Sequence, residues 1–286
     1  MKRATAGAIF GDTFRVFGKN IPVYLGLYLL YAAVTTALTL LWARLLYGIV
    51  VGTIAVPPNL ATGSFADVLF LFFLATLVVA FIGARIGSIL TATLTYYAYR
   101  RYRNEQVTLG GAFGRGVRRF LSVLGASIVQ GVIVACLLLV PLGFMGAGIF
   151  MFNLCLIGIA GIVLVLIVPI AIYIVIALSL YAPAIMIEGK GAIGGLIRSW
   201  ELTSERRMTL FVALLGITIL SVLVSVTVSL FLGSSFDPYV RVIGTIIPTM
   251  ITGSWTVIFG AVAYHQVLPE EIPKAWPQLI GTWDSS

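Results

Sequence analysis

The stretch FLSVLGASIVQGVIVACLLLVPLGFMGAGIFMFNLCLIGIAGIVLVLIVPIAIYIVIALSLYAPAIMI, residues 120–187, contains no charged side chain. At about 1.5 Å per helical residue, it is long enough to cross a bilayer core of about 30 Å two or three times. A water-soluble domain of this size cannot hide so much apolar surface, because much of its area faces solvent. The stretch therefore predicts an integral membrane protein with helical spans.

The composition of the whole chain agrees with this prediction. Of its 286 residues, 60% are hydrophobic and only 10% are charged, with a net charge of +8. The Lys and Arg residues lie in short clusters between long uncharged runs, which is typical of loops on the cytoplasmic side of membrane proteins. A nucleic-acid-binding surface would instead present a basic stripe on a polar domain, so we expect no nucleic-acid partner.

Outward from this stretch, the apolar runs predict six spans, at residues 21–41, 65–96, 120–141, 162–187, 208–232 and 242–268. Three crossings within residues 120–187 would put the basic loops 100–119 and 188–207 on opposite sides, so the positive-inside bias favours two. The Gly-rich connection 143–161 is then expected to form a partly embedded hairpin or re-entrant turn, with a helix extension as the alternative.

The distribution of basic residues predicts the orientation of the chain. The N-terminal segment, the two basic loops and the tail together hold 15 of the 18 Lys and Arg residues. We therefore expect both termini on the cytoplasmic side of a prokaryotic plasma membrane. The tail, residues 269–286, is polar and contains prolines, so we expect a loosely ordered cytoplasmic segment there.

A pattern of apolar residues, Gly and Arg precedes spans one, three and five. Its three copies are Phe10-Gly11-x-x-Phe14-Arg15-x-Phe17, Phe113-Gly114-x-x-Val117-Arg118-x-Phe120 and Ile193-Gly194-x-x-Ile197-Arg198-x-Trp200. Apolar residues at i, i+4 and i+7 share one helix face, so each copy predicts a short amphipathic helix in the interface plane, with its Arg at phosphate level. We refer to these predicted helices as the elbows.

The elbows predict an all-α polytopic bundle made of three repeats, each an elbow plus a transmembrane hairpin. The repeat units would be residues 1–103, 104–187 and 188–268, within a single transmembrane domain of residues 1–268. The alternative is that basic amphipathic helices at a membrane surface converge on this pattern without any repetition.

Four arginines are candidate functional residues. Arg15, Arg118 and Arg198 of the elbows are candidates for binding lipid headgroups, which makes membrane lipids the expected partner. Arg85 lies within the second predicted span, where a charge is costly and usually lines a cavity or pairs with another group. The alternative for Arg85 is that it snorkels toward the interface or bonds backbone carbonyls.

Other polar residues have a functional and a structural interpretation. The cluster formed by Glu188, Glu201, Glu205, Arg198, Arg206 and Arg207 either binds a phosphate-bearing ligand or, as is more usual, caps helices and anchors an elbow. Stripes of small hydroxyl residues occur at Ser221, Ser225, Ser229, Thr245, Thr249, Thr252 and Thr256. Such stripes normally mean close helix packing with interhelical hydrogen bonds, and otherwise line a polar pore.

The segment from Tyr181 to Thr203, YAPAIMIEGKGAIGGLIRSWELT, resembles a block shared by a broad group of prokaryotic membrane proteins. The group includes the membrane domain fused to some bacterial glycerophosphodiester phosphodiesterases and stand-alone relatives of unknown function. The resemblance implies a bundle of this organisation in a plasma membrane and no established activity. The chain has one His and no room for the fused catalytic barrel, so no catalytic residue is transferred.

No arrangement of residues typical of catalysis is present in the sequence, and lone His265, Cys136 and Cys155 have no partners at metal-ligand spacing. We therefore expect a protein that is not an enzyme and has no cofactor or metal. The leading hypothesis is a membrane-organising, lipid-associated or anchoring scaffold protein. The alternatives are a small-solute transporter or channel, or an accessory subunit of a larger complex, with a membrane-protein partner or a second copy of the chain.

Overall fold

The computed structural model describes residues 5–50, 65–233 and 237–268, and within these ranges every element is a helix. The elements are α1 Ala6–Lys19, α2 Ile21–Val50, α4 Phe65–Tyr102, α5 Leu109–Phe150, α6 Leu154–Leu178, α7 Tyr181–Glu188, α8 Ala192–Thr203, α9 Arg207–Val228, the π-helix η1 Ser229–Gly233 and α10 Pro238–Val267. Six helical segments are long and apolar enough to cross a membrane. The predicted all-α transmembrane bundle with six spans is confirmed, whereas the predicted tail lies outside the described residues.

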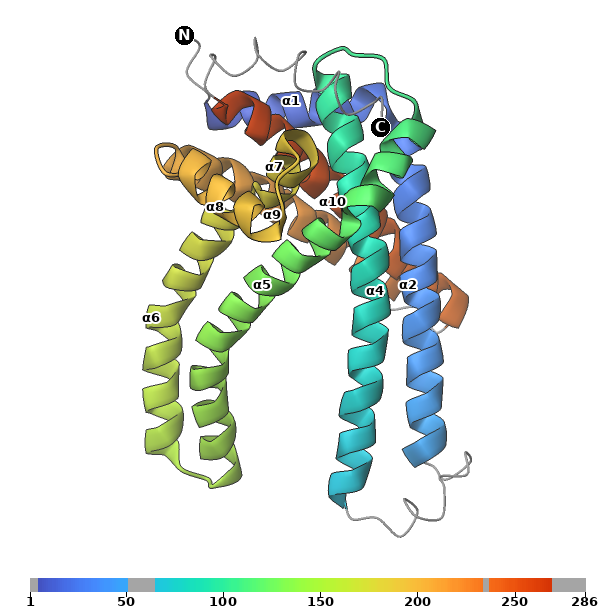
Figure 1. Cartoon of the computed structure of the whole chain (residues 1–286). Coiled ribbons are helices and arrows are strands. Elements are labelled where there is room, and N and C mark those ends of the chain that lie inside the picture. The colour runs from blue at the N-terminus through green and yellow to red at the C-terminus, as the bar shows by residue number, and fades with distance from the viewer. Residues whose placement is uncertain (1–4, 51–64, 234–236, 269–286) are drawn as a thin grey trace.

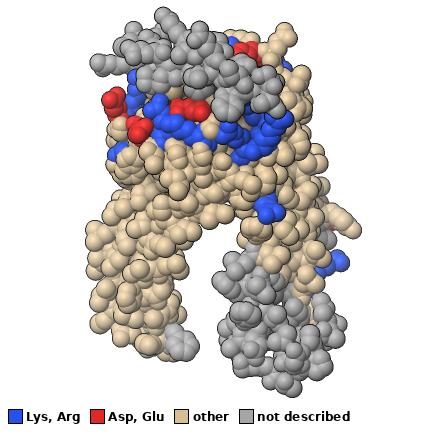
Figure 2. Space-filling view, viewed as in Figure 1, with Lys and Arg blue, Asp and Glu red and all other residues tan. Residues whose placement is uncertain are grey.

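Two long hairpins, α2–α4 and α5–α6, diverge from a common end of the molecule, and α1 lies across that end (Figure 1). α10 packs against α1, α2, α4 and α9 and so joins the first hairpin to the last pair of helices. Lys, Arg, Asp and Glu side chains gather in a band at the end where α1 and α8 lie, and little charge lies below it (Figure 2). We call this end, formed by residues 5–20, 96–120, 180–207 and 261–268, the basic end.

The hairpin of α5 and α6 differs from the prediction for residues 143–161. No re-entrant turn forms, because α5 continues through Pro141 to Phe150 and α6 starts at Leu154. Asn153 caps the start of α6, with its Oδ1 accepting a hydrogen bond from the Leu156 N–H at 3.1 Å. In lipid, backbone N–H and C=O groups must form hydrogen bonds within the protein, and a helix forms them within itself. An irregular turn would leave some of these groups without partners, so the Gly-rich apolar segment continues as a helix. The helix extension is therefore the correct alternative.

The second elbow is also not a separate helix. Residues 109–120 form the first turns of α5, whose 42 residues make a helix about 63 Å long at 1.5 Å per residue. That length is about twice the thickness of a bilayer core. Figure 1 shows α5 running obliquely at its start and then turning alongside α6. The first and third elbows, α1 and α8, are separate helices as predicted.

The fourth span is interrupted between α6 and α7, a feature that the prediction missed. Pro183, in the first turn of α7, has no N–H and clashes with a continuing helix. The helix therefore breaks one turn earlier, at Ser179 and Leu180. The Ala177 carbonyl accepts hydrogen bonds from the Ser199 and Thr203 hydroxyls of α8 at 2.9 and 3.1 Å. The break thus becomes the place where α8 is attached to the span.

Glycines permit close helix crossings near the basic end. A Cβ atom on Gly116 of α5 would lie 2.3 Å from Oγ1 and 3.0 Å from the backbone N of Thr93 in α4. A Cβ atom on Gly253 of α10 would lie 2.3 Å from the ring of Tyr28 in α2. At both crossings the neighbouring helix approaches the backbone directly, which only Gly allows.

The hydroxyl stripe of α10 does not form the predicted interhelical hydrogen bonds. Its four threonine hydroxyls each donate to a backbone carbonyl of α10 itself, three or four residues earlier. Thr245 and Thr256 are exposed. A threonine hydroxyl in a helix is readily satisfied by its own preceding turn, which removes the need for a partner helix. For α10, the prediction of packing through these hydrogen bonds is therefore wrong.

Candidate functional sites at the basic end

The three elbow segments share one buried position, which is occupied by Thr13 in α1, Gly116 in α5 and Leu196 in α8. Other positions of the pattern are buried in only one or two of the copies. The apolar faces on the other side differ in their surroundings. That of α1 packs on the bundle, with the ring centroids of Phe14 and Trp255 5.1 Å apart. The apolar faces of the second and third elbows remain exposed, as Phe113 (52% exposed) and Ile193 (67% exposed) show.

The three predicted headgroup arginines lie in three different environments. Arg15 is 70% exposed and forms an ion pair with Asp12 at 2.9 Å. Arg118 is exposed, and within the described part of the chain it has no hydrogen bond or ion pair. Arg198 is only 19% exposed and is held between two carboxylates. Arg15 and Arg118 are therefore accessible to a headgroup, whereas Arg198 links α8 to α7 inside the protein.

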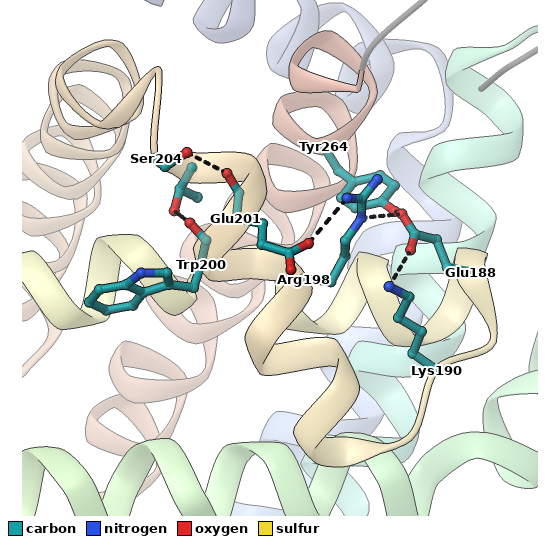
Figure 3. A network of polar contacts seen from close by, with 8 residues as sticks. Glu188, Lys190, Arg198, Trp200, Glu201, Ser204 and Tyr264 are labelled. Atoms are coloured by element: carbon teal, nitrogen blue, oxygen red, sulfur yellow. Dashed lines mark hydrogen bonds and ion pairs between the residues drawn. The ribbon is translucent and has the colours of Figure 1, made fainter. Parts of the chain in front are cut away.

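Glu188 at the end of α7 is the centre of a buried polar network (Figure 3). Its side chain is 10% exposed and pairs with Arg198 Nε at 3.0 Å and Lys190 Nζ at 3.3 Å. The Tyr264 hydroxyl of α10 donates a further hydrogen bond to Glu188. Burial alone would lower the pKa of Arg198, but its hydrogen bonds and ion pairs with Glu188 and Glu201 raise the pKa above its usual value. The network joins α7, α8 and α10 through one carboxylate.

The loop that follows Glu188 is also held by a residue of α5. Gly189 has a φ of +69°, a left-handed conformation that favours Gly and ends α7. The Arg119 guanidinium of α5 donates a hydrogen bond to the Gly189 carbonyl. Of the predicted cluster, Glu188, Arg198 and Glu201 form one network that anchors α8, whereas Arg206 and Arg207 lie outside it. Glu205 is exposed and has no ion pair among the described residues.

Asp12 of α1 is the centre of a second network. It accepts hydrogen bonds from the Tyr102 hydroxyl at 2.8 Å and from Gln266 Nε2 at 2.9 Å, in addition to the ion pair with Arg15. His265, the neighbour of Gln266, packs on the ring of Tyr102 with centroids 5.0 Å apart. Asp12 thus fastens the first elbow to the ends of α4 and α10.

A ladder of tyrosines and arginines lies along the last turns of α4. Arg100 Nε donates to the Tyr96 hydroxyl at 3.0 Å, and Arg101 Nε donates to the Tyr97 hydroxyl at 3.2 Å. These pairs are four residues apart and therefore share a helix face. Glu105 pairs with Arg100 and Arg103 just beyond the helix. Most of the basic residues at this end are therefore already paired within the protein.

Arg207, the first residue of α9, lies against two aromatic rings. Its guanidinium carbon lies 4.6 Å from the ring centroid of Tyr173 in α6 and 4.7 Å from that of Trp200 in α8. The two rings meet edge to face at 5.9 Å and are 43% and 41% exposed. Arg207 Nε is buried and has no hydrogen-bond partner.

Arg85 of α4 is exposed, and its guanidinium carbon lies 4.5 Å from the ring centroid of Phe81, one turn earlier. Two residues later, Gly87 lies against α2, where a Cβ atom would be 3.3 Å from the Tyr31 hydroxyl oxygen. Exposure fits both interpretations of Arg85, because a snorkelling arginine and an arginine that lines a cavity are each accessible, so its role stays a prediction.

The sequence analysis missed the residues that complete these networks. Tyr264, Gln266 and Asp12 are single polar residues within apolar or basic segments, and no spacing relates them to their partners. One signal was present, because a Tyr followed four residues later by an Arg occurs three times, at Tyr96–Arg100, Tyr97–Arg101 and Tyr99–Arg103. That spacing predicts side chains that touch on one helix face.

The sequence matches a domain of unknown function, DUF7847, over residues 6–267. The chain belongs to the DUF7847 family. No curated protein and no solved structure matches it. The DUF7847 match covers all the described helices and contains no link to the membrane domain of phosphodiesterases, so that resemblance stays a prediction.

Proposed function

We propose that this DUF7847 protein is a non-enzymatic, lipid-associated membrane protein that organises or anchors components at one leaflet through its basic end. The single observation that carries the proposal is the second elbow, where an exposed apolar face lies beside an arginine that no described residue neutralises. Phe113 and Val117 are exposed beside Arg118, a guanidinium without a partner among the described residues. An apolar face in the acyl boundary beside a cation at phosphate level is how an interfacial helix binds anionic lipid.

The proposal assigns different roles to the elbow arginines. Arg118 and Arg15 are exposed and would contact headgroups directly. Arg198 would act indirectly, because Glu188 and Glu201 already neutralise it. In this proposal the three elbows are repeats whose arginines have diverged, and the basic end faces the cytoplasmic side of a plasma membrane.

Lipid association of arginine variants tests the proposal. We expect Arg15→Gln with Arg118→Gln to weaken retention of phosphatidylglycerol in native mass spectrometry, because each exposed Arg near a surface contributes about 1 kcal/mol. Arg44→Gln is the matched control, because Arg44 is an exposed arginine of α2 outside the basic end. Equal lipid retention in the double variant, the control and the wild type would reject the proposal.

A further inference from the structure

We propose that Arg207, Trp200 and Tyr173 form a discrete binding site for the phosphate group of a single phospholipid. The inference rests on the proposed lipid association and names one site for it. It begins from Arg207, whose buried Nε lacks a hydrogen-bond partner. In the described part of the chain, Arg207 also forms no ion pair, and Glu205, its closest acidic residue in sequence, does not pair with it.

The other arginines near this site have acceptors. Arg206 donates to the Gln266 carbonyl at 3.1 Å, Arg198 bonds Glu188 and Glu201, and Arg119 bonds the Gly189 carbonyl. Arg207 has only the two aromatic rings, which attract its charge but accept no strong hydrogen bond. A guanidinium offers five N–H donors in a planar fork, and leaving a charged donor buried and unpaired is costly. Nε itself is buried, so an external anion would accept hydrogen bonds from the outer N–H groups of this guanidinium, which are not among the buried unpaired atoms.

The position of Arg207 increases the local positive charge. It is the first residue of α9, Arg206 precedes it, and the first turn of α9 has no acidic residue. A helix N-terminus carries a partial positive charge, which disfavours a cation and favours an anion. Arg207 therefore adds its own charge to that of a helix N-terminus, and both attract an anion.

The aromatic rings determine the kind of anion. Trp200 and Tyr173 are half-exposed, and Figure 3 shows Trp200 pointing away from the Glu188 network. The neighbouring residues Ile197 and Met208 are 56% and 73% exposed. Trp and Tyr side chains favour the headgroup level of a bilayer, where one side is apolar and the other is wet. The site therefore fits a phosphate group with attached acyl chains, which the apolar residues would contact.

The guanidinium is already oriented for this ligand. Two rings meeting edge to face at 82° hold its carbon at nearly equal distances of 4.6 and 4.7 Å. Less side-chain freedom is then lost when the fork binds a phosphate through two parallel hydrogen bonds. Lysine would keep the charge but lose the fork, so Arg207→Lys separates recognition of phosphate geometry from simple attraction.

Native mass spectrometry of the full-length protein from nanodiscs of phosphatidylcholine with phosphatidylglycerol tests the site. We expect the wild type to retain one phospholipid, Arg207→Gln to retain it about tenfold more weakly, and Arg207→Lys to be intermediate, as the loss of a charge-assisted hydrogen bond implies. Trp200→Leu with Tyr173→Leu should also weaken retention. Arg44→Gln is the control, and each variant's thermal unfolding midpoint verifies that it is folded. Equal retention by wild type, Arg207→Gln and Arg207→Lys would overturn the site.

Two further arms separate the possible sources of the phosphate and the two proposals. Inorganic phosphate, added to lipid-depleted protein in detergent, should leave the unfolding midpoint unchanged if acyl chains are required. Stabilisation of the wild type but not of Arg207→Gln by inorganic phosphate alone would assign the site to a soluble phosphate and reject the lipid. Loss of lipid in Arg207→Gln but not in Arg15→Gln with Arg118→Gln would support the site and reject the proposed role of the elbow arginines.

Discussion

The two ends of α5 show how differently the same helix can be held. At the basic end, Gly116 touches α4 and Arg119 bonds the loop after α7. At the far end, α5 packs against α6, where a Cβ atom on Gly148 would lie 2.8 Å from Ile157. Phe152, in the connection between the two helices, and Leu154, the first residue of α6, are 93% and 82% exposed.

This contrast indicates which contacts fix the helices relative to one another. Between helices in lipid the hydrophobic effect contributes little, so close packing and polar contacts must fix the helices relative to one another. At the basic end, the described residues form two carboxylate-centred networks and the glycine crossing at Thr93. The far end of the α5–α6 hairpin has a close glycine contact as well, between Gly148 and Ile157, but no carboxylate-centred network among the described residues. We therefore expect substitutions at the basic end to cost much more stability than substitutions at the hairpin tip.

The largest effect is expected for Glu188→Gln. The change leaves Arg198 in a half-buried site without its main counter-charge, and we expect a loss of about 3 kcal/mol in the free energy of unfolding. Unfolding in detergent micelles titrated with a denaturing surfactant measures the loss. Glu201→Gln is the matched control, because Glu201 is 56% exposed and its pair with Arg198 should contribute at most about 1 kcal/mol. Similar losses in both variants would mean that the Glu188 network does not fasten the basic end.

A smaller effect is expected at the α4–α5 crossing. Gly116→Ala places a Cβ atom within 2.3 Å of Thr93 Oγ1, so the helices must separate, at a cost of about 2 kcal/mol. Gly114→Ala, one half-turn away on the same helix, meets no atom within 4 Å. It should be neutral or stabilise by up to about 1 kcal/mol through helix propensity. The same surfactant titration measures both variants, and equal stability would contradict the close crossing.

The sequence was sufficient to predict the six spans because each depends on local hydropathy. It also predicted two separate elbow helices from the spacing of Phe10, Phe14 and Phe17 and of Ile193, Ile197 and Trp200. The Gly-rich segment 143–161 was misjudged because glycine breaks helices in water, whereas a lipid environment forces the backbone to bond internally. Composition alone therefore gave the wrong structure for this segment.

The candidate sites were less predictable, because their decisive contacts join distant parts of the sequence. Glu188 and Tyr264 are 76 residues apart, and Asp12 and Gln266 are 254 apart. No local pattern indicates which polar residue of α10 will meet which carboxylate. The three elbow arginines looked equivalent in sequence, and only the neighbours that each one meets in space distinguish Arg198 from Arg15 and Arg118.

The smallest effect is expected at the tip of the α5–α6 hairpin. Phe152 is 93% exposed and has a φ of +52°, a left-handed conformation that strains a bulky side chain but is tolerated by Asn. We expect Phe152→Asn to change the free energy of unfolding in micelles by less than about 0.5 kcal/mol, or to raise it slightly as the backbone strain is relieved. Met151→Asn is the matched control, because Met151 is 69% exposed but has an ordinary φ of −87°. If Phe152→Asn destabilises as much as Glu188→Gln, the hairpin tip contributes as much stability as the basic end. The expected difference in stability between the two ends of α5 would then be wrong.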